Sequence, residues 1–174
     1  LNDHRQRRPV GNKYEHRATD LPARFHSPLK LVNPPVGLMF FEGAPRLLKS
    51  GVSIPGIHAG DPSKVALEAY PGFVVRHWTR QSYKNDAKAK QTPARRAARR
   101  AIVENLTEGR APFGFRLRAS RAMLSSLIAD GSGDRLDAVI CAMQAAWAMQ
   151  KKDFGFPDPV DPLEGWITLV ARQE

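Results

Sequence analysis

The chain has 174 residues, of which 27 are lysine or arginine and 17 are aspartate or glutamate, so its formal net charge is +10 and its pI is near 10.3. Such a basic chain favours a polyanionic partner, with nucleic acid as the foremost candidate. The only cysteine, Cys141, excludes an internal disulfide and a cysteine-based zinc site, and a cytoplasmic location is the simplest expectation. No apolar run approaches the roughly 20 residues that span a bilayer, so no membrane association is expected.

Residues 1–35 are polar, basic and without a sustained hydrophobic period, which predicts an extended basic N-terminal arm. We expect the globular domain to occupy residues 36–174, because 174 residues suffice for one domain plus an extension. At its start, the apolar residues of 36–49 predict a buried helix that is disturbed near Pro45, where a backbone donor is missing.

A short apolar run, Lys64–Tyr70, lies between turn-rich segments and is typical of an interior strand. Glu68 is its only carboxylate, and an ionised group in a dry strand is costly without a partner. Two interpretations remain open at this point. Glu68 is either a functional carboxylate or a glutamate at an exposed strand end that bonds to a neighbouring amide or arginine.

Residues 72–80 predict a short helix, and a stronger helix follows from Thr92 to Gly109, with a capping threonine, a proline in the first turn and a glycine at the exit. Lys84–Arg121 contains eleven lysines or arginines and three acids. This excess indicates either a solvated helix face or a surface that contacts phosphates. The candidate substrate contacts are Lys84, Arg95, Arg96, Arg99 and Arg100.

Another capped helix is predicted over 120–128, and an apolar helix begins at Asp134 after a glycine-rich break. Asp137 follows Asp134 by three residues, so both carboxylates project from one face of the first turn. Helix capping explains Asp134 well, whereas Asp137 lies a full turn into the apolar sequence. The pair is therefore consistent with structural hydrogen bonding or with a divalent metal site. A last strand is predicted over 166–170.

Glu68, Asp134 and Asp137 are far apart in sequence, but they converge if the Asp134 helix packs its N-terminus beside the Glu68 strand. Carboxylate oxygens prefer hard cations, so Mg²⁺ or Mn²⁺ would be the cofactor. Such sites activate water and stabilise the leaving oxygen in phosphodiester hydrolysis, and a basic surface nearby would hold the substrate.

At these residues the chain resembles the family known as domain of unknown function 429, whose members are regarded as predicted nucleases of the ribonuclease H-like fold. The resemblance is carried by Ser27–Lys30, Asn33–Met39, Glu42–Leu48, Ala66–Gly72, Ser82–Lys84, Gly133–Ala138 and Asp161–Trp166. It implies an α/β fold with a mixed sheet flanked by helices, and it implies that Glu68, Asp134 and Asp137 are catalytic metal ligands. Arg17 and Asp20 look like a second polar motif of the family.

One feature departs from this pattern. Ribonuclease H-like nucleases begin with a hairpin whose first strand carries a metal-bridging aspartate, and no stretch before Lys30 predicts that strand. The fold is therefore expected to be incomplete at its N-terminus, with the upstream strands outside this sequence. The leading hypothesis is a metal-dependent nuclease of unknown nucleic-acid substrate. A non-catalytic nucleic-acid-binding or scaffold protein on the same fold is the alternative, and a small-molecule phosphohydrolase is a third.

Overall fold

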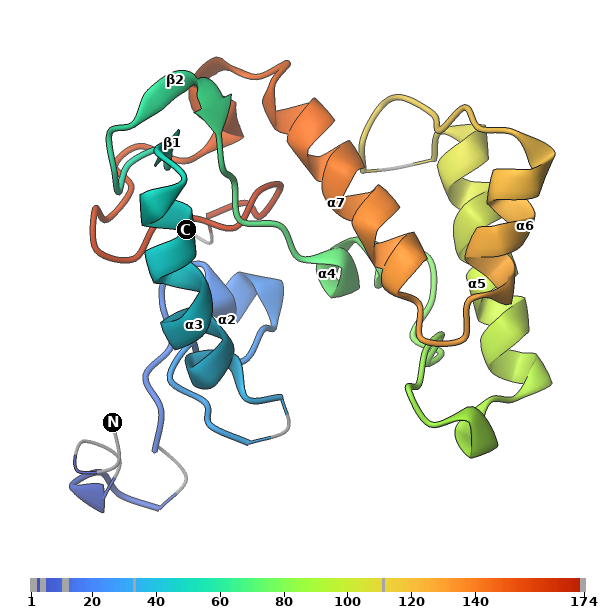
Figure 1. Ribbon diagram of the computed structural model, residues 1–174, viewed down its shortest axis with the longest axis horizontal. Coiled ribbons are helices and arrows are strands. Elements are labelled where there is room, and N and C mark those ends of the chain that lie inside the picture. Colours follow the sequence, from blue (N-terminus) through green and yellow to red (C-terminus); the bar gives the residue numbers. More distant parts are fainter. Residues whose placement is uncertain (1–2, 4–5, 11–12, 33, 111, 173–174) are drawn as a thin grey trace. The chain divides into compact units, whose positions relative to one another are not determined.

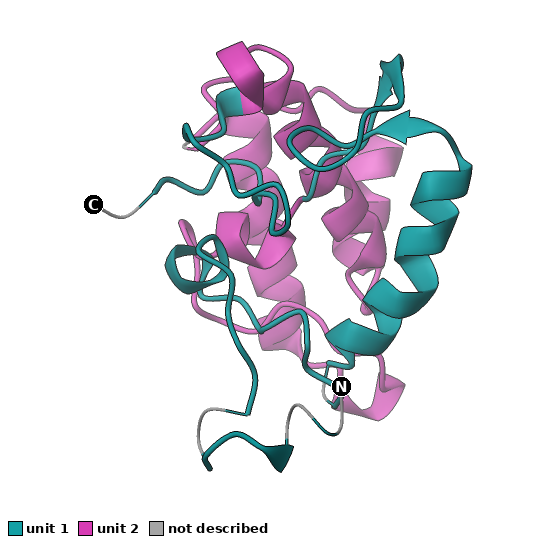
Figure 2. Ribbon diagram, turned by 90° about the vertical axis from the view of Figure 1, so that its left-hand side faces the viewer, with its two compact units in different colours: residues 1–68, 155–174 teal, residues 69–154 magenta. Residues whose placement is uncertain are grey.

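The computed structural model describes all residues except 1–2, 4–5, 11–12, 33, 111 and 173–174 (Figure 1). It divides into two compact units, which consist of residues 1–68 with 155–174 and of residues 69–154 (Figure 2). Helices and a small parallel sheet are both present, so the chain is of mixed α/β class. Within the described part of the chain, every helix is too short or too polar to cross a bilayer.

The first unit, residues 1–68 with 155–174, contains few regular elements for its length. They are α2 (Asp20–Ala23), α3 (Val36–Lys49), β1 (Val52–Ser53) and β2 (Asp61–Val65). The strands β1 and β2 pair in parallel, with an irregularity in register between Val52 and Ser53. Short strands give little sheet, so side-chain contacts carry much of the order of this unit.

The helix α3 has the predicted bounds, but the prediction that it is buried is wrong. Gly37 is its one buried residue, and its backbone N–H donates to the carbonyl of Lys30 at 2.7 Å. Large apolar side chains along the helix are exposed, including Phe40 at 65% and Phe41 at 72%. The helical period correctly identified the element, but amphipathic spacing alone does not say which partner covers the apolar face.

The predicted interior strand of residues 64–70 and the predicted last strand of residues 166–170 are also corrected. The strand β2 ends at Val65, earlier than the predicted Lys64–Tyr70, and its residues are partly or fully exposed. Glu68 instead forms an isolated parallel bridge with Ile167, in which the Thr168 N–H donates to the Glu68 carbonyl at 2.9 Å. Residues 166–170 do not form a regular strand, because Leu169 has a positive φ of 79°, which interrupts extension. Most of these residues are buried.

The predicted N-terminal arm is not extended throughout. Its residues 20–23 form α2, and Thr19 and Asp20 are both fully buried. Other parts of the predicted arm, namely residues 1–2, 4–5, 11–12 and 33, lie outside the described residues. The boundary predicted at residue 35 stays a prediction, since the compact unit runs through it.

The second unit, residues 69–154, is mainly helical. Its helices are α4 (Pro71–Val75), a 3-10 turn (Lys88–Lys90), α5 (Pro93–Glu108), α6 (Arg121–Ala129) and α7 (Asp134–Ala148), and a further 3-10 turn (Lys152–Gly155) follows. The helix α5 packs on α6, and α7 contacts both α4 and α6. The predicted helix over residues 72–80 is shorter than expected.

The two capped helices of this unit are confirmed. The Thr92 hydroxyl accepts from the Arg95 N–H at 3.2 Å and starts α5, and Gly109 ends it at φ 74°. The Ser120 hydroxyl likewise accepts from the Met123 N–H at the start of α6. The apolar core is formed by Val74, Val75, Ala98, Ile102, Val103, Leu106, Leu127, Leu136, Ile140 and Met143.

Gly133 begins α7 under two constraints. Its φ of 79° is in the left-handed region, and a Cβ built on it would lie 2.8 Å from the Cβ of Lys84. Only glycine satisfies both conditions without strain. The close approach places the backbone of residues 83–85 directly against the start of α7.

Replacing Gly133 with alanine should therefore destabilise the fold more than the same change at Gly114, which has φ 77° and no atom within 4 Å of an added Cβ. The positive φ should cost about 1–2 kcal/mol at both sites. The contact with Lys84 should add roughly 1–3 kcal/mol at Gly133 alone. Urea denaturation of the two variants measures this difference, and equal losses would contradict the close approach.

Candidate catalytic and metal-binding residues

The predicted site residues fall into two groups, which belong to different units. Asp134, Asp137, Lys84 and the arginines of α5 are in residues 69–154. Glu68 belongs to the other unit, together with the polar motif of Arg17 and Asp20. Each group is described by itself below, and the convergence of Glu68 with the two aspartates stays a prediction.

Asp134 and Asp137 occupy the first turn of α7, as predicted. Asp134 is exposed, and its Oδ2 accepts from the Ser132 hydroxyl at 2.9 Å. The Asp137 side chain is 19% exposed. Both negative charges lie at the positive end of the helix dipole, which stabilises ionised carboxylates in the first turn.

Asp130 is a residue that the sequence analysis missed. Its Oδ2 accepts from the Arg135 N–H at 3.0 Å, and its Oδ1 lies 2.9 Å from the Ser132 hydroxyl, whose single proton it shares with Asp134. The hydrogen bond from the Arg135 backbone holds the pKa of Asp130 below its usual value. Asp130 thus satisfies a backbone donor at the start of α7, the role that the sequence had suggested for Asp134. The sequence contained a signal for this role, because Asp130 is the first residue of the turn Asp130–Gly133, which precedes α7.

Asp137 is held by two neighbouring residues of the loop after α4. The Tyr83 hydroxyl donates to Asp137 Oδ1 at 2.6 Å, and the Lys84 ammonium pairs with Oδ2. Burial raises the pKa of the Tyr83 phenol, and the charge of Asp137 raises it further, so this group stays protonated and donates. Asp137 therefore has both the hydrogen-bond donor and the cation that a carboxylate needs when it enters an apolar core.

Cys141 lies one turn beyond Asp137 on α7 and is partly buried. Burial raises the pKa of its thiol, and the negative charge of Asp137 acts in the same direction. A raised pKa keeps the sulfur protonated at neutral pH, so Cys141 lacks the thiolate that a nucleophile requires.

The arginines of α5 do not all face solvent, which corrects the predicted surface of four. Arg96 and Arg100 are exposed and Arg95 is half-buried, but Arg99 is only 3% exposed. Arg99 donates from Nη1 to the Tyr83 carbonyl at 2.7 Å and from Nε to the Ile128 carbonyl at 2.8 Å. It joins three segments of the unit, and this structural role removes it from the accessible phosphate contacts.

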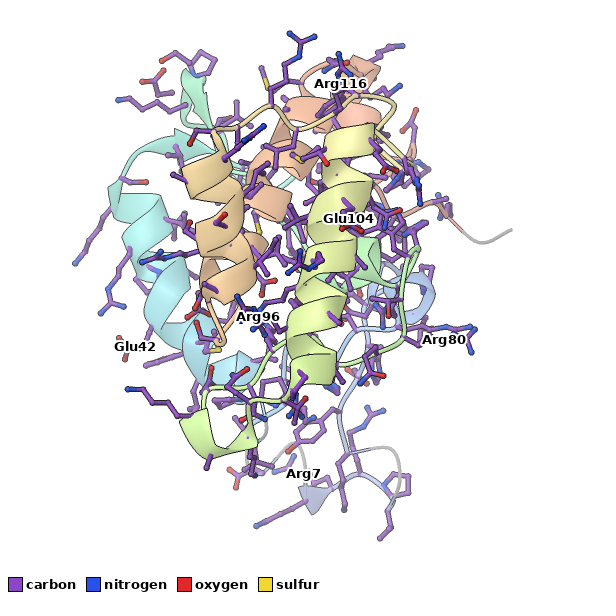
Figure 3. The ribbon with its side chains drawn as sticks, turned by 90° about the vertical axis from the view of Figure 1, so that its right-hand side faces the viewer. Arg7, Glu42, Arg80, Arg96, Glu104 and Arg116 are labelled. Atoms are coloured by element: carbon purple, nitrogen blue, oxygen red, sulfur yellow. The ribbon has the colours of Figure 1, made fainter. Side chains whose placement is uncertain are left out.

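An open hollow of about 690 Å³ borders the N-terminus of α5 and the turn before α7. Lys88, Arg96 and Ser132 are among the residues that line it, together with Asp86 and Asp130. Figure 3 shows Arg96 toward the start of α5 and Glu104 farther along the same helix. Ser132, which lines the hollow, also bonds to Asp134.

In the other unit, Glu68 is paired with Arg17. The Arg17 Nη1 and Nη2 donate to the two oxygens of Glu68 at 2.6 and 2.7 Å, and Nε and Nη2 donate to Asp20 at 2.8–3.3 Å. Nη1 also donates to the Glu164 carbonyl at 3.1 Å, so acceptors exist for all five N–H groups of the guanidinium. Glu68 is 39% exposed and pairs with Arg17. This agrees with the second interpretation of the sequence, in which an exposed glutamate bonds to a neighbouring amide or arginine.

The backbone around this pair is tied together as well. The Ala18 N–H donates to Glu164 Oε2, and the Ile167 N–H donates to the Thr19 hydroxyl, both at 3.0 Å. Burial by itself lowers the pKa of Arg17, but the hydrogen bonds that its guanidinium donates to Glu68 and Asp20 outweigh burial and raise the pKa. Arg17 thus stays charged and balances a fully buried Asp20.

Metal binding by these residues depends on their oxygen donors. Among the described residues, no group of three or more aspartates, glutamates, histidines or cysteines is arranged to hold a metal ion. Asp134 and Asp137 provide two carboxylates on one face of one turn. Mg²⁺ is commonly held by one or two carboxylates with waters and substrate phosphates, so this pair fits an open site of that kind.

The Arg17 network should contribute substantially to stability. Replacing Arg17 with methionine leaves buried Asp20 without its cation, so the free energy of unfolding should fall by roughly 3 kcal/mol. Arg46→Met is the matched control, because Arg46 is 74% exposed and pairs only with Glu42 among the contacts of the described residues. Its loss should be below about 1 kcal/mol. Urea denaturation compares the two variants, and similar losses would show that the Arg17 network is not a stabilising centre.

Residues 53–161 match the family described as "Protein of unknown function (DUF429)". The matched range includes Glu68, Lys84, Asp134 and Asp137, whereas Arg17 and Asp20 precede it. No curated protein and no solved structure matches the sequence. Since the matched range covers more than half of its length, the chain belongs to the family of proteins of unknown function DUF429.

Proposed function

We propose that this protein is a metal-dependent nuclease that hydrolyses phosphodiester bonds with Mg²⁺ or Mn²⁺, on a ribonuclease H-like fold. The observation that carries the proposal is the carboxylate pair at the start of α7. Asp137 accepts from the Tyr83 hydroxyl and pairs with Lys84 while its side chain stays 19% exposed, and Asp134 beside it is exposed. Among the described residues, the bond to the Arg135 N–H at the start of α7 comes from Asp130 and not from these two carboxylates.

In this proposal Asp134 and Asp137 hold the metal, and Glu68 is the third predicted ligand. The bound ion would supply charge stabilisation at the phosphate and a water of lowered pKa. Lys84 has a flexible stem and a side chain that is 45% exposed. Its ammonium can exchange the Asp137 carboxylate for a phosphate oxygen of the substrate.

The charge distribution along α5 supports contact with a polyanion. Arg95 and Arg96 follow the helix start at Pro93 and no acid lies in the first turn, whereas Glu104 and Glu108 lie toward the end. Cations near the N-terminus and anions near the C-terminus both oppose the helix dipole, each at about 0.3–1 kcal/mol. An arrangement that costs stability favours a role in binding, and a phosphate at this end would relieve the repulsion.

The metal site is tested by calorimetric titration with Mn²⁺. The wild-type chain should bind the ion, and the Asp134→Asn/Asp137→Asn double variant should not, because amide groups replace both charged ligands. Asp153→Asn is the matched control, since the Asp153 side chain is 78% exposed and its φ of 49° is tolerated by asparagine.

The same three proteins should then be incubated with Mg²⁺ and labelled single- and double-stranded DNA and RNA. Cleavage by the wild type and by Asp153→Asn, with none by the double variant or with EDTA present, is the expected result. Equal Mn²⁺ binding by all three proteins would move the metal away from α7, and absence of both binding and cleavage would overturn the proposed function.

The second candidate is a non-catalytic nucleic-acid-binding protein, which the charge distribution of α5 also favours. Under either function, Arg96→Gln/Arg100→Gln should lower the slope of log affinity against log salt by about 1–2 for duplex DNA, at about 0.9 per phosphate contact. Arg46→Gln/Arg80→Gln removes two exposed arginines outside α5 and should leave the slope unchanged. Salt-dependent affinity without metal-dependent cleavage would select the second candidate.

A further inference from the structure

We infer that Tyr83 is a positioning residue for Asp137. It would fix one carboxylate oxygen, so that the other can pass from Lys84 to the metal without reorientation of the side chain. This inference rests on the proposed function, because it assigns Tyr83 a role at the same carboxylate. The sequence analysis gave Tyr83 no role.

The two partners of Asp137 differ in mobility. Tyr83 is 8% exposed, and its hydroxyl reaches Oδ1 at 2.6 Å, a short charge-assisted hydrogen bond. Lys84 reaches Oδ2 with an ammonium on a side chain that is 45% exposed. A rigid ring with one hydroxyl defines the direction of an oxygen, whereas a flexible ammonium mainly supplies charge. Tyr83 therefore determines the geometry of Asp137, and Lys84 balances its charge.

Tyr83 is itself held by the segment that leads into α7. Its carbonyl accepts from Arg99 Nη1, and Arg99 Nε donates to the Ile128 carbonyl at the end of α6. Two residues later, the Asn85 N–H donates to the Gly131 carbonyl at 3.1 Å. The Tyr83 ring thus projects from a loop that is bonded to the turn just before α7, and Asp137 lies in the first turn of that helix. Buried Arg99 supports this loop through its bond to the Tyr83 carbonyl.

Tyr83 touches Asp137 and not the metal in this proposal, so it would act through that carboxylate by its hydrogen bond to Oδ1. Metal ligands commonly depend on such outer partners, whose loss costs about 10- to 100-fold in metal affinity or activity.

Tyr83→Phe tests the inference, because it removes the hydroxyl and keeps the buried ring. We expect the Mn²⁺ dissociation constant to rise by about 10-fold and Mg²⁺-dependent cleavage to fall by about 10- to 100-fold. Tyr14→Phe makes the same chemical change in the other unit and should behave as the wild type. Thermal unfolding without metal checks that both variants retain the fold.

A double-mutant cycle separates positioning from a general structural role. If Tyr83 acts through Asp137, adding Tyr83→Phe to Asp137→Asn should not weaken Mn²⁺ binding further, whereas an independent role would give additive losses. Wild-type affinity and activity in Tyr83→Phe, or additive losses in the cycle, would overturn the inference and leave the proposed function standing. A wild-type chain that neither binds Mn²⁺ nor cleaves nucleic acid would overturn both.

Discussion

The charge of Asp137 is the constraint on which the described arrangement of residues 69–154 depends. A carboxylate that enters an apolar helix is costly unless donors and a cation meet it. Tyr83 and Lys84 meet it from a neighbouring loop, and Arg99 holds that loop against the end of α6. Gly133 permits the close approach of Lys84 to the helix start. One partly buried charge thus accounts for the placement of Lys84 and, through the loop that it supports, of Arg99.

In the unit of residues 1–68 and 155–174, a carboxylate is likewise compensated by a basic side chain. Asp20 is fully buried, and Arg17 compensates it while also pairing with the more exposed Glu68. Because the parallel pair β1 and β2 is short, these polar contacts connect segments that a larger sheet would otherwise join. In both units, a buried or partly buried carboxylate is paired with a basic side chain.

The two helices of the proposed site differ in how their charges relate to the dipole. The acids of α7 lie at its start, where the dipole stabilises them, whereas the arginines near the start of α5 oppose it. The proposed contact of α5 with a polyanion is therefore argued from the position of its arginines as well as from the net charge of +10.

Local sequence signals determined the helices well. Thr92, Pro93 and Gly109 mark the start and end of α5, and the apolar period of 36–49 gave the bounds of α3, because caps and helical spacing act within a few residues. The sequence also identified Asp137 as a carboxylate that needs a partner. Only the tertiary structure decided what that partner is, which arginine is buried, and that Glu68 bridges Ile167 instead of lying in an interior strand. These features depend on contacts between residues tens of positions apart. Caps and helical spacing extend over only a few residues, so they cannot predict such contacts.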